Sequence, residues 1–283
     1  MTYLRSFMLL VLALLVISVV TKAGEGVQLR YSPVKNNVYS YVFSSSLKQT
    51  MGDMDMSTSM ESEQTLDFRA VAVEKTSCTF NIRNSDFKVS VAGLSMAGVP
   101  DTTMIVPATS VTESLELASN GTIISRRMQQ SPDKQVHSPQ TAMLGQLNKQ
   151  SFQHLLIPLP AKKIAPGETW KQERRDTSEN GMITMMIFQF SYLGMKDTLG
   201  KKCAVISCKS TMMAIEGSIA QMGVNMTIEG EGTARGTLFI ESSSGMAVTG
   251  RVAVQADIRM AITGQENMII PVDMETITTF SRK

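Results

Sequence analysis

Apolar and polar residues alternate with a period of two over most of the chain beyond residue 36. Such alternation is typical of β-strands that bury one face and expose the other. It is nearly unbroken over residues 53–69, and in the preceding segment Tyr39, Tyr41 and Phe43 share one apolar face. Met51-Gly52-Asp53 lies between the two segments and predicts a turn. Together these segments predict a long antiparallel hairpin.

Further strands follow the same rule. The apolar parity changes between Ile82 and Phe87, which predicts a turn or bulge at residues 84–86. Asn120-Gly121 joins two alternating segments and is typical of a two-residue hairpin turn. Later strands are predicted over residues 182–192, 203–215, 224–228, 233–240, 246–262 and 268–280. Long strands with one apolar face twist and curl, so we predict a mainly β fold, a curved half-barrel or barrel of antiparallel strands with an apolar concave face.

One predicted helix, residues 138–157, interrupts the strands. Ser138 suits an N-cap and Pro139 the first turn, and apolar residues including Leu144 and Leu147 recur at helical spacing until Pro158. We expect this helix to act as a lid over the concave face. Residues 24–283 then form one β-rich domain, with two related halves (24–137 and 159–283) if their loose similarity reflects a duplication.

The N-terminal residues have the layout of a secretory signal. Arg5 precedes an apolar run over residues 7–20, and the small residue Ala23 suits a cleavage site. The run is short for a membrane span, which needs roughly 20 apolar residues. We therefore predict a signal peptide over residues 1–23 and a periplasmic or extracellular protein, anchored at its N-terminus if the segment is not cleaved. The net charge of +2 is dispersed, which argues against a nucleic-acid partner.

Three cysteines leave two interpretations open. Cys203 and Cys208 are five residues apart on one predicted strand, so they should point to opposite faces. A bridge from Cys78 to one of them is one interpretation for an exported protein, and three small buried residues is the other.

Catalytic chemistry has little material in this chain. Its two histidines, His137 and His154, leave almost no basis for a histidine metal cluster or a catalytic triad. Gly93-Leu94-Ser95-Met96-Ala97 lacks the last glycine of a nucleophile elbow. We expect a protein that is not an enzyme and has no catalytic residues, metal ligands or cofactor. Trp170 follows a Pro-Gly-Glu turn at the start of a strand and should anchor that corner in the core.

Methionine is abundant, with 22 residues. Met54, Met56 and Met60 share one strand face, with Met51 on the other parity, and soft thioethers can bind Cu(I). Methionine also replaces Leu and Val on apolar strand faces elsewhere, which favours an ordinary core. A concave sheet lined by flexible methionines would also suit acyl chains. The residues predicted to line such a ligand are Tyr39, Tyr41, Phe43, Met54, Met56, Met60, Phe68, Leu144, Leu147, Met246 and Met260.

The segment over residues 155–170 contains Pro-Leu-Pro and, further on, Gly-Glu-Thr-Trp. It resembles an uncharacterised bacterial family of exported β-rich proteins marked by Pro-x-Pro followed by Gly-Asp-x-Trp. Lys35-Asn36-Asn37-Val38-Tyr39-Ser40-Tyr41 is similar to the family's opening Lys-Gly-Asp-x-Tyr-x-Tyr, and the strand over residues 236–240 with Gly245 fits its later half. The resemblance implies export and a β fold, and no reaction or ligand. The architecture is also similar to periplasmic lipoprotein-carrier half-barrels.

These observations favour an exported, non-enzymatic protein that binds a hydrophobic ligand, a lipid or acyl chain, or a partner protein of the envelope. The alternative is a structural or adaptor protein with a closed core. Copper binding through methionine is a minor third possibility. The sequence gives no oligomeric state.

Overall fold

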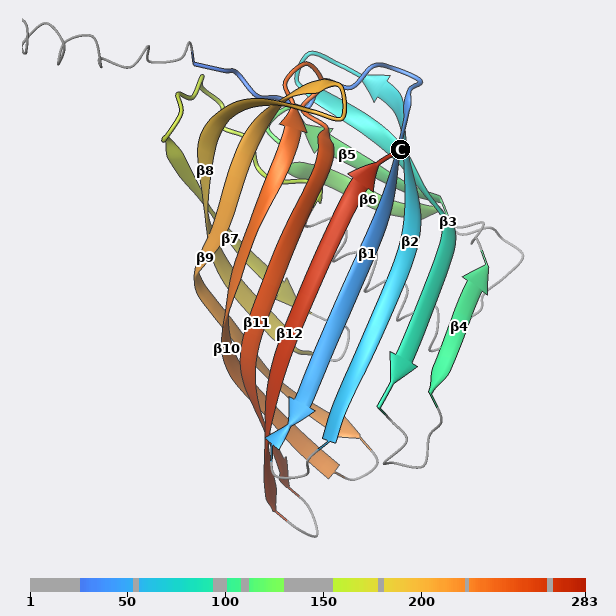
Figure 1. Ribbon diagram of the computed structural model, residues 1–283, viewed down its shortest axis with the longest axis vertical. Helices are drawn as coiled ribbons and strands as arrows, with labels where there is room; N and C mark the ends of the chain where they lie inside the picture. The colour runs from blue at the N-terminus through green and yellow to red at the C-terminus, as the bar shows by residue number, and fades with distance from the viewer. Residues whose placement is uncertain are drawn as a thin grey trace, which may run out of the picture.

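A computed structural model of the protein describes residues 26–52, 56–93, 101–107, 112–129, 155–177, 181–221, 224–263 and 267–283. Twelve strands in these residues form one sheet in the order β6-β5-β3-β2-β1-β12-β11-β10-β9-β8-β7, and β4 also pairs with β3 (Figure 1). Every strand pair is antiparallel. The strands are β1 Val38–Met51, β2 Met56–Val73, β3 Ser77–Ala92, β4 Thr102–Pro107, β5 Thr112–Ala118, β6 Ile123–Gln129, β7 Thr169–Thr177, β8 Ile183–Thr198, β9 Lys201–Gln221, β10 Val224–Glu241, β11 Ala247–Thr263 and β12 Met268–Arg282. The prediction of a mainly β, long-stranded antiparallel fold is confirmed.

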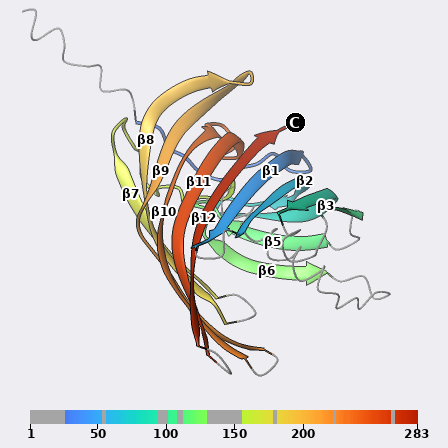
Figure 2. The same ribbon diagram turned by 60° about the horizontal axis from the view of Figure 1, so that its bottom comes forward.

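The sheet is strongly curved, and its order ends at β6 and β7 (Figure 2). Apolar side chains lie on the concave face, as the alternation predicts. The convex face carries exposed charged residues on neighbouring strands, among them Glu229, Glu231, Asp257, Arg259 and Glu275. Because each strand puts alternate residues on opposite faces, this division fixes the register of every long strand.

Local sequence signals position the first strands as expected. β1 and β2 pair from Val38↔Arg69 to Met51↔Met56, which confirms the predicted hairpin. The register between β2 and β3 shifts where Thr65 faces Asp86 and Leu66 faces Asn84, so residues 84–86 form a bulge. β5 and β6 form the hairpin predicted around Asn120-Gly121, but its loop has three residues, 119–121, and not two. The amide of Ala118 donates to the carbonyl oxygen of Thr122, and only Gly121 in the loop has a positive φ, +84°.

Glycine allows the sheet to bend around β10. Gly230, Gly232 and Gly236 follow one another on the concave side of this strand. A Cβ on Gly232 would lie 2.5 Å from the carbonyl oxygen of Gln255 and 3.0 Å from the Sδ of Met213. Side chains of β9 and β11 therefore close over the bare backbone of β10.

Several sequence predictions need correction or fall outside the description. The strands predicted over 224–228 and 233–240 are one continuous strand, β10, because its glycines lie in a bend and not in a turn. β4 was not predicted, and only the start of β7, at Trp170, was. The signal segment and residues 138–154 of the predicted helix lie outside the described residues. The last three residues of that prediction, 155–157, are described and are buried.

The proposed cysteine bridge is wrong: Cys78, Cys203 and Cys208 are free and buried. Cys208 belongs to the main core and Cys203 does not, in line with opposite faces.

Candidate functional site

The concave face has two regions of different character. One lies where β1, β3, β9 and β11 begin and where β2, β8, β10 and β12 end; we call it the filled end. The other lies on β8 to β12, toward the opposite ends of these strands. The first is packed by the chain's own segments, and the second is only partly covered by the described residues.

Aromatic rings form the filled end. Phe68 makes edge-on contacts with Tyr41 (5.6 Å between ring centroids) and Phe80 (6.0 Å). Phe43 packs against Phe280 at 5.6 Å. All five side chains are almost fully buried. Rings at these spacings gain attraction beyond the burial of their area, so this region is a rigid core.

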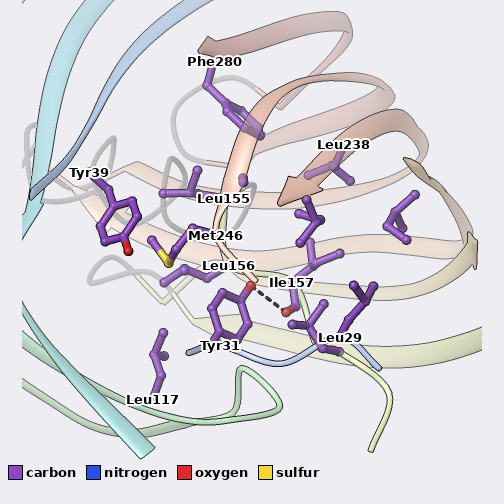
Figure 3. Packing of buried hydrophobic residues seen from close by; sticks show 14 of the residues in the cluster. Leu29, Tyr31, Tyr39, Leu117, Leu155, Leu156, Ile157, Leu238, Met246 and Phe280 are labelled. Atoms are coloured by element: carbon purple, nitrogen blue, oxygen red, sulfur yellow. Dashed lines mark hydrogen bonds between the residues drawn. The ribbon is translucent and has the colours of Figure 1, made fainter. Parts of the chain in front are cut away.

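Two segments without regular strands cover these rings. Leu29 and Tyr31 come from the N-terminal segment, and residues 155–164 supply Leu155, Leu156 and Ile157 (Figure 3). The hydroxyl of Tyr31 donates a hydrogen bond to the carbonyl oxygen of Ile157 at 3.0 Å. The two segments also join through a bridge between Val27 and Ile164.

A tryptophan fastens the second segment to the sheet. Trp170 stacks on Phe190 with 5.5 Å between ring centroids, and its Nε1 donates to the carbonyl oxygen of Pro158 at 2.9 Å. Trp170 thus anchors its corner as the sequence predicts. The described side chains of the filled end therefore pack against one another as a core.

The second region, which we call the methionine face, is apolar and half-covered. Met186 pairs with Met213 across β8 and β9, Ile228 with Met260 across β10 and β11, and Ala256 with Met274 across β11 and β12. Its buried members are Met213, Ile215, Ile228 and Ala256, and its half-buried members are Met182, Met186, Met226, Val254, Ile258, Met260 and Met274. A smaller group on β2 and β3 continues the same concave side with Met60, Phe87, Val89 and Val91.

The structure divides the predicted ligand-lining residues between these regions. Those placed in the core of the filled end are Tyr39, Tyr41, Phe43, Phe68 and Met246. Met260 is half-buried on the methionine face, and Met60 is half-buried in the smaller group on β2 and β3. Met54, Leu144 and Leu147 lie outside the described residues, and only the backbone of Met56 is described.

The cross-strand register corrects the placement of Met51. This residue faces Met56 directly, and paired residues of neighbouring strands share a face. Met51 is therefore on the concave side. Odd and even positions identify the two faces within one strand only, because the turn between two strands can change which of them points to the concave side.

Two pairs of polar groups on the concave side are satisfied within the sheet. The hydroxyls of Ser45 and Thr278 share a hydrogen bond of 3.0 Å. The buried carboxylate of Glu113 on β5 forms a two-point ion pair with Arg126 on β6, whose second contact, from Nη2 to Oε2, is 3.1 Å. One formal charge borders the methionine face: Arg174 on β7 pairs with Met186 on β8, and its guanidinium lies 5.4 Å from the centroid of the Phe188 ring.

Burial also keeps the titratable core groups neutral. Desolvation raises the pKa of Tyr31 and Tyr41 well above the usual tyrosine range. It raises the pKa of the Cys78 thiol to about 12 and that of the Cys208 thiol to about 11. Neutral phenols and thiols supply no base or nucleophile near neutral pH. Within the described ranges no three His, Cys, Asp or Glu side chains gather as metal ligands.

Residues 110–247 match the model of a family described as "Family of unknown function (DUF6263)". No curated protein matches the chain. Among solved structures, an outer membrane channel from Pseudomonas putida F1 is 8% identical, with 89% of this chain and 97% of that chain covered and a TM-score of 0.28. Salmonella typhi OmpF in complex with daunomycin is 6% identical, with 86% and 97% covered and a TM-score of 0.26. At such scores neither likeness bears on the function of this chain.

In the part of the chain that the structure describes, no helix is long and apolar enough to cross a membrane.

Sequence reasoning missed two parts of this arrangement. The two segments that fill one end contact each other across 126 residues of the sequence, as the hydrogen bond between Tyr31 and Ile157 shows. The second missed part is the hairpin between β8 and β9, which turns at Leu199-Gly200. The usual sequence signal for such a turn is Asn-Gly, and here leucine takes the place of asparagine.

Proposed function

We propose that this exported protein binds the acyl chain of a lipid, or a similar elongated apolar guest, on the methionine face. The proposal depends on one observation: apolar side chains on the concave side of a curved sheet stay half-buried at one end, while the other end is filled. In a finished core, methionines such as Met226, Met260 and Met274 would be covered.

The chemistry of methionine supports a guest without fixed shape. Its unbranched thioether side chain adopts many conformations and contacts varied apolar partners. The side chains of the methionine face are predominantly apolar, which suits a hydrocarbon better than an ionic ligand. The guanidinium of Arg174, opposite Met186 at the β7 border of this face, lies over the ring of Phe188. The filled end would set how deeply the guest can enter.

Extraction tests the proposal most directly. The protein purified after export should show, in native mass spectrometry, an added mass of a few hundred daltons that organic solvent removes. The extracted material should contain acyl chains. A clean apo mass, together with no displacement of an environment-sensitive dye by fatty acid, would contradict the proposal.

A matched pair of variants locates the site. Met260→Gln combined with Met274→Gln keeps side-chain length and places polar amides on the methionine face, so dye affinity should fall about tenfold or more. Met212→Gln is the control, because Met212 is 42% exposed on β9 beside Met213 and points to the convex side. Equal losses in both proteins would show that the dye binds elsewhere.

An adaptor role is the second candidate, supported by the edge of the sheet at β6. Ile123 and Ile124 are consecutive, so they point to opposite faces, and both are exposed. An edge strand with exposed apolar residues can add a strand from an envelope protein. Cross-linking of the protein in envelope preparations tests this role. It is favoured if the purified protein is free of lipid, if the cross-linked species disappears in Ile124→Lys, and if the methionine variants leave dye affinity unchanged.

A further inference from the structure

The β8–β9 hairpin ends in a turn with an unusual residue. Thr198 pairs with Lys201, so Leu199 and Gly200 are the two turn residues, with φ of +49° and +71°. Two positive φ values define the turn type that normally carries Asn-Gly. A leucine pays a steric penalty there, and its side chain is 65% exposed. Neither local geometry nor core packing explains the leucine.

Other exposed apolar residues accompany Leu199. Leu193, on the same hairpin, is 57% exposed, and Val34 and Val38 are exposed just before and at the start of β1. The antiparallel register places the start of β1 and the β8–β9 turn at the same end of the sheet. Figure 2 shows this hairpin extending from that end.

Exposed lysines lie at the same end of the sheet as these residues. The exposed lysines of this end, which we call the basic rim, are Lys35, Lys75, Lys196, Lys201, Lys202 and Lys283. The exposed carboxylates nearest to them in sequence are Glu74 and Asp197, and Glu241 is paired with Arg282 and Lys201.

We propose that the basic rim docks on an anionic lipid surface and that Leu199 inserts into its interfacial layer. Clustered lysines are attracted to anionic headgroups, and an exposed leucine among them gains free energy by leaving water for the acyl boundary. A strained turn that presents this leucine fits a role in binding, because strain of this kind is retained at functional positions. The proposal is independent of whether the methionine face holds a guest.

Vesicle cosedimentation tests the docking with the full exported protein. Binding to vesicles of phosphatidylcholine with about a third phosphatidylglycerol should exceed binding to pure phosphatidylcholine by tenfold or more, and should weaken as salt rises. Lys196→Gln with Lys202→Gln should reduce affinity about thirtyfold, because each lysine contributes about 1 kcal/mol at such a surface, or about fivefold.

Leu199→Asn separates docking from folding. Asparagine suits the turn, so the midpoint of urea unfolding should rise while vesicle affinity falls about tenfold. Ile269→Asn is the matched control, since Ile269 is 69% exposed near the opposite rim and should bind like the wild type. Equal binding to neutral and anionic vesicles, no binding to either, or an equal loss in Ile269→Asn would overturn the proposal. A protein partner for the rim would give the second of these results.

Discussion

The two regions of the concave face use the same strands for different ends. At the filled end, rings from four neighbouring strands (β3, β2, β1 and β12) and apolar side chains of β8 to β11 meet two returning segments of the chain, and nearly every side chain is buried. On the methionine face, β8 to β12 continue with flexible side chains that remain half-buried. The alternation of apolar and polar residues is equally regular in both, so pattern alone does not distinguish a completed core from an incompletely covered one.

Phe68→Ala should give the largest loss of stability. Phe68 is fully buried between Tyr41 and Phe80, and removing its ring leaves a cavity that the curved sheet cannot collapse. We expect the free energy of unfolding to fall by about 3–5 kcal/mol in urea titrations. A loss below about 1 kcal/mol would mean that the filled end is loosely packed.

Alkaline pH should destabilise the filled end through Cys208. The thiol has a pKa of about 11 in the folded chain against 9.0 for the ordinary group, so the folded state retains a proton that the unfolded state releases. Stability is therefore complete below pH 9 and falls as pH rises from 9 to 11, by about 2–3 kcal/mol for this group.

Cys208→Ala provides the control for this titration. Its unfolding free energy, measured at intervals from pH 8 to pH 11, should decline less steeply than that of the wild type. Parallel curves would show that Cys208 does not control the alkaline transition.

Tyr31→Phe should have an intermediate effect. It removes the donor to the carbonyl oxygen of Ile157 within a buried contact, which should cost about 1–2 kcal/mol. Tyr39→Phe is the comparison, since the Tyr39 hydroxyl accepts from the amide of Val34 in a less buried place and should matter less. The reverse order, in chemical denaturation, would show that the N-terminal segment is held by other contacts.

Met260→Ala should have the smallest effect on stability among the buried or half-buried positions. Because its side chain is only half-covered, we expect a loss of about 1 kcal/mol, well below that of Phe68→Ala. Met212→Ala, on the convex side, should stay within about 0.5 kcal/mol of the wild type. A loss at Met260 as large as that at Phe68 would show that the methionine face is a completed core.

Local patterns were sufficient for much of the sheet. The hairpin of β1 and β2, the bulge at residues 84–86 and the Asn120-Gly121 turn each follow from a few adjacent residues. Only the start of β7, at Trp170, was predicted, because Thr169–Thr177 is an edge strand with charged side chains and little apolar alternation. β10 was divided because Gly230 and Gly232 look like a turn unless the bend of the sheet is known.

The candidate site was less predictable for a physical reason. Tyr39, Tyr41 and Phe43 have the pattern of ligand-lining residues, and only the return of residues 155–164 reveals that they are core. That contact is long-range, and no signal in either segment specifies its partner. Met260 was correctly placed on the concave side, because strand periodicity alone determines which way it points.

Enclosure in this fold does not depend on a closed ring of hydrogen bonds. In a barrel, strand number and shear together fix the diameter. Here the strand order ends at β6 and β7, with no pairing between them in the described residues. The curvature of the sheet can increase or decrease through changes in strand twist without the loss of hydrogen bonds between strands. The width of the space on the concave side is therefore governed by side-chain packing.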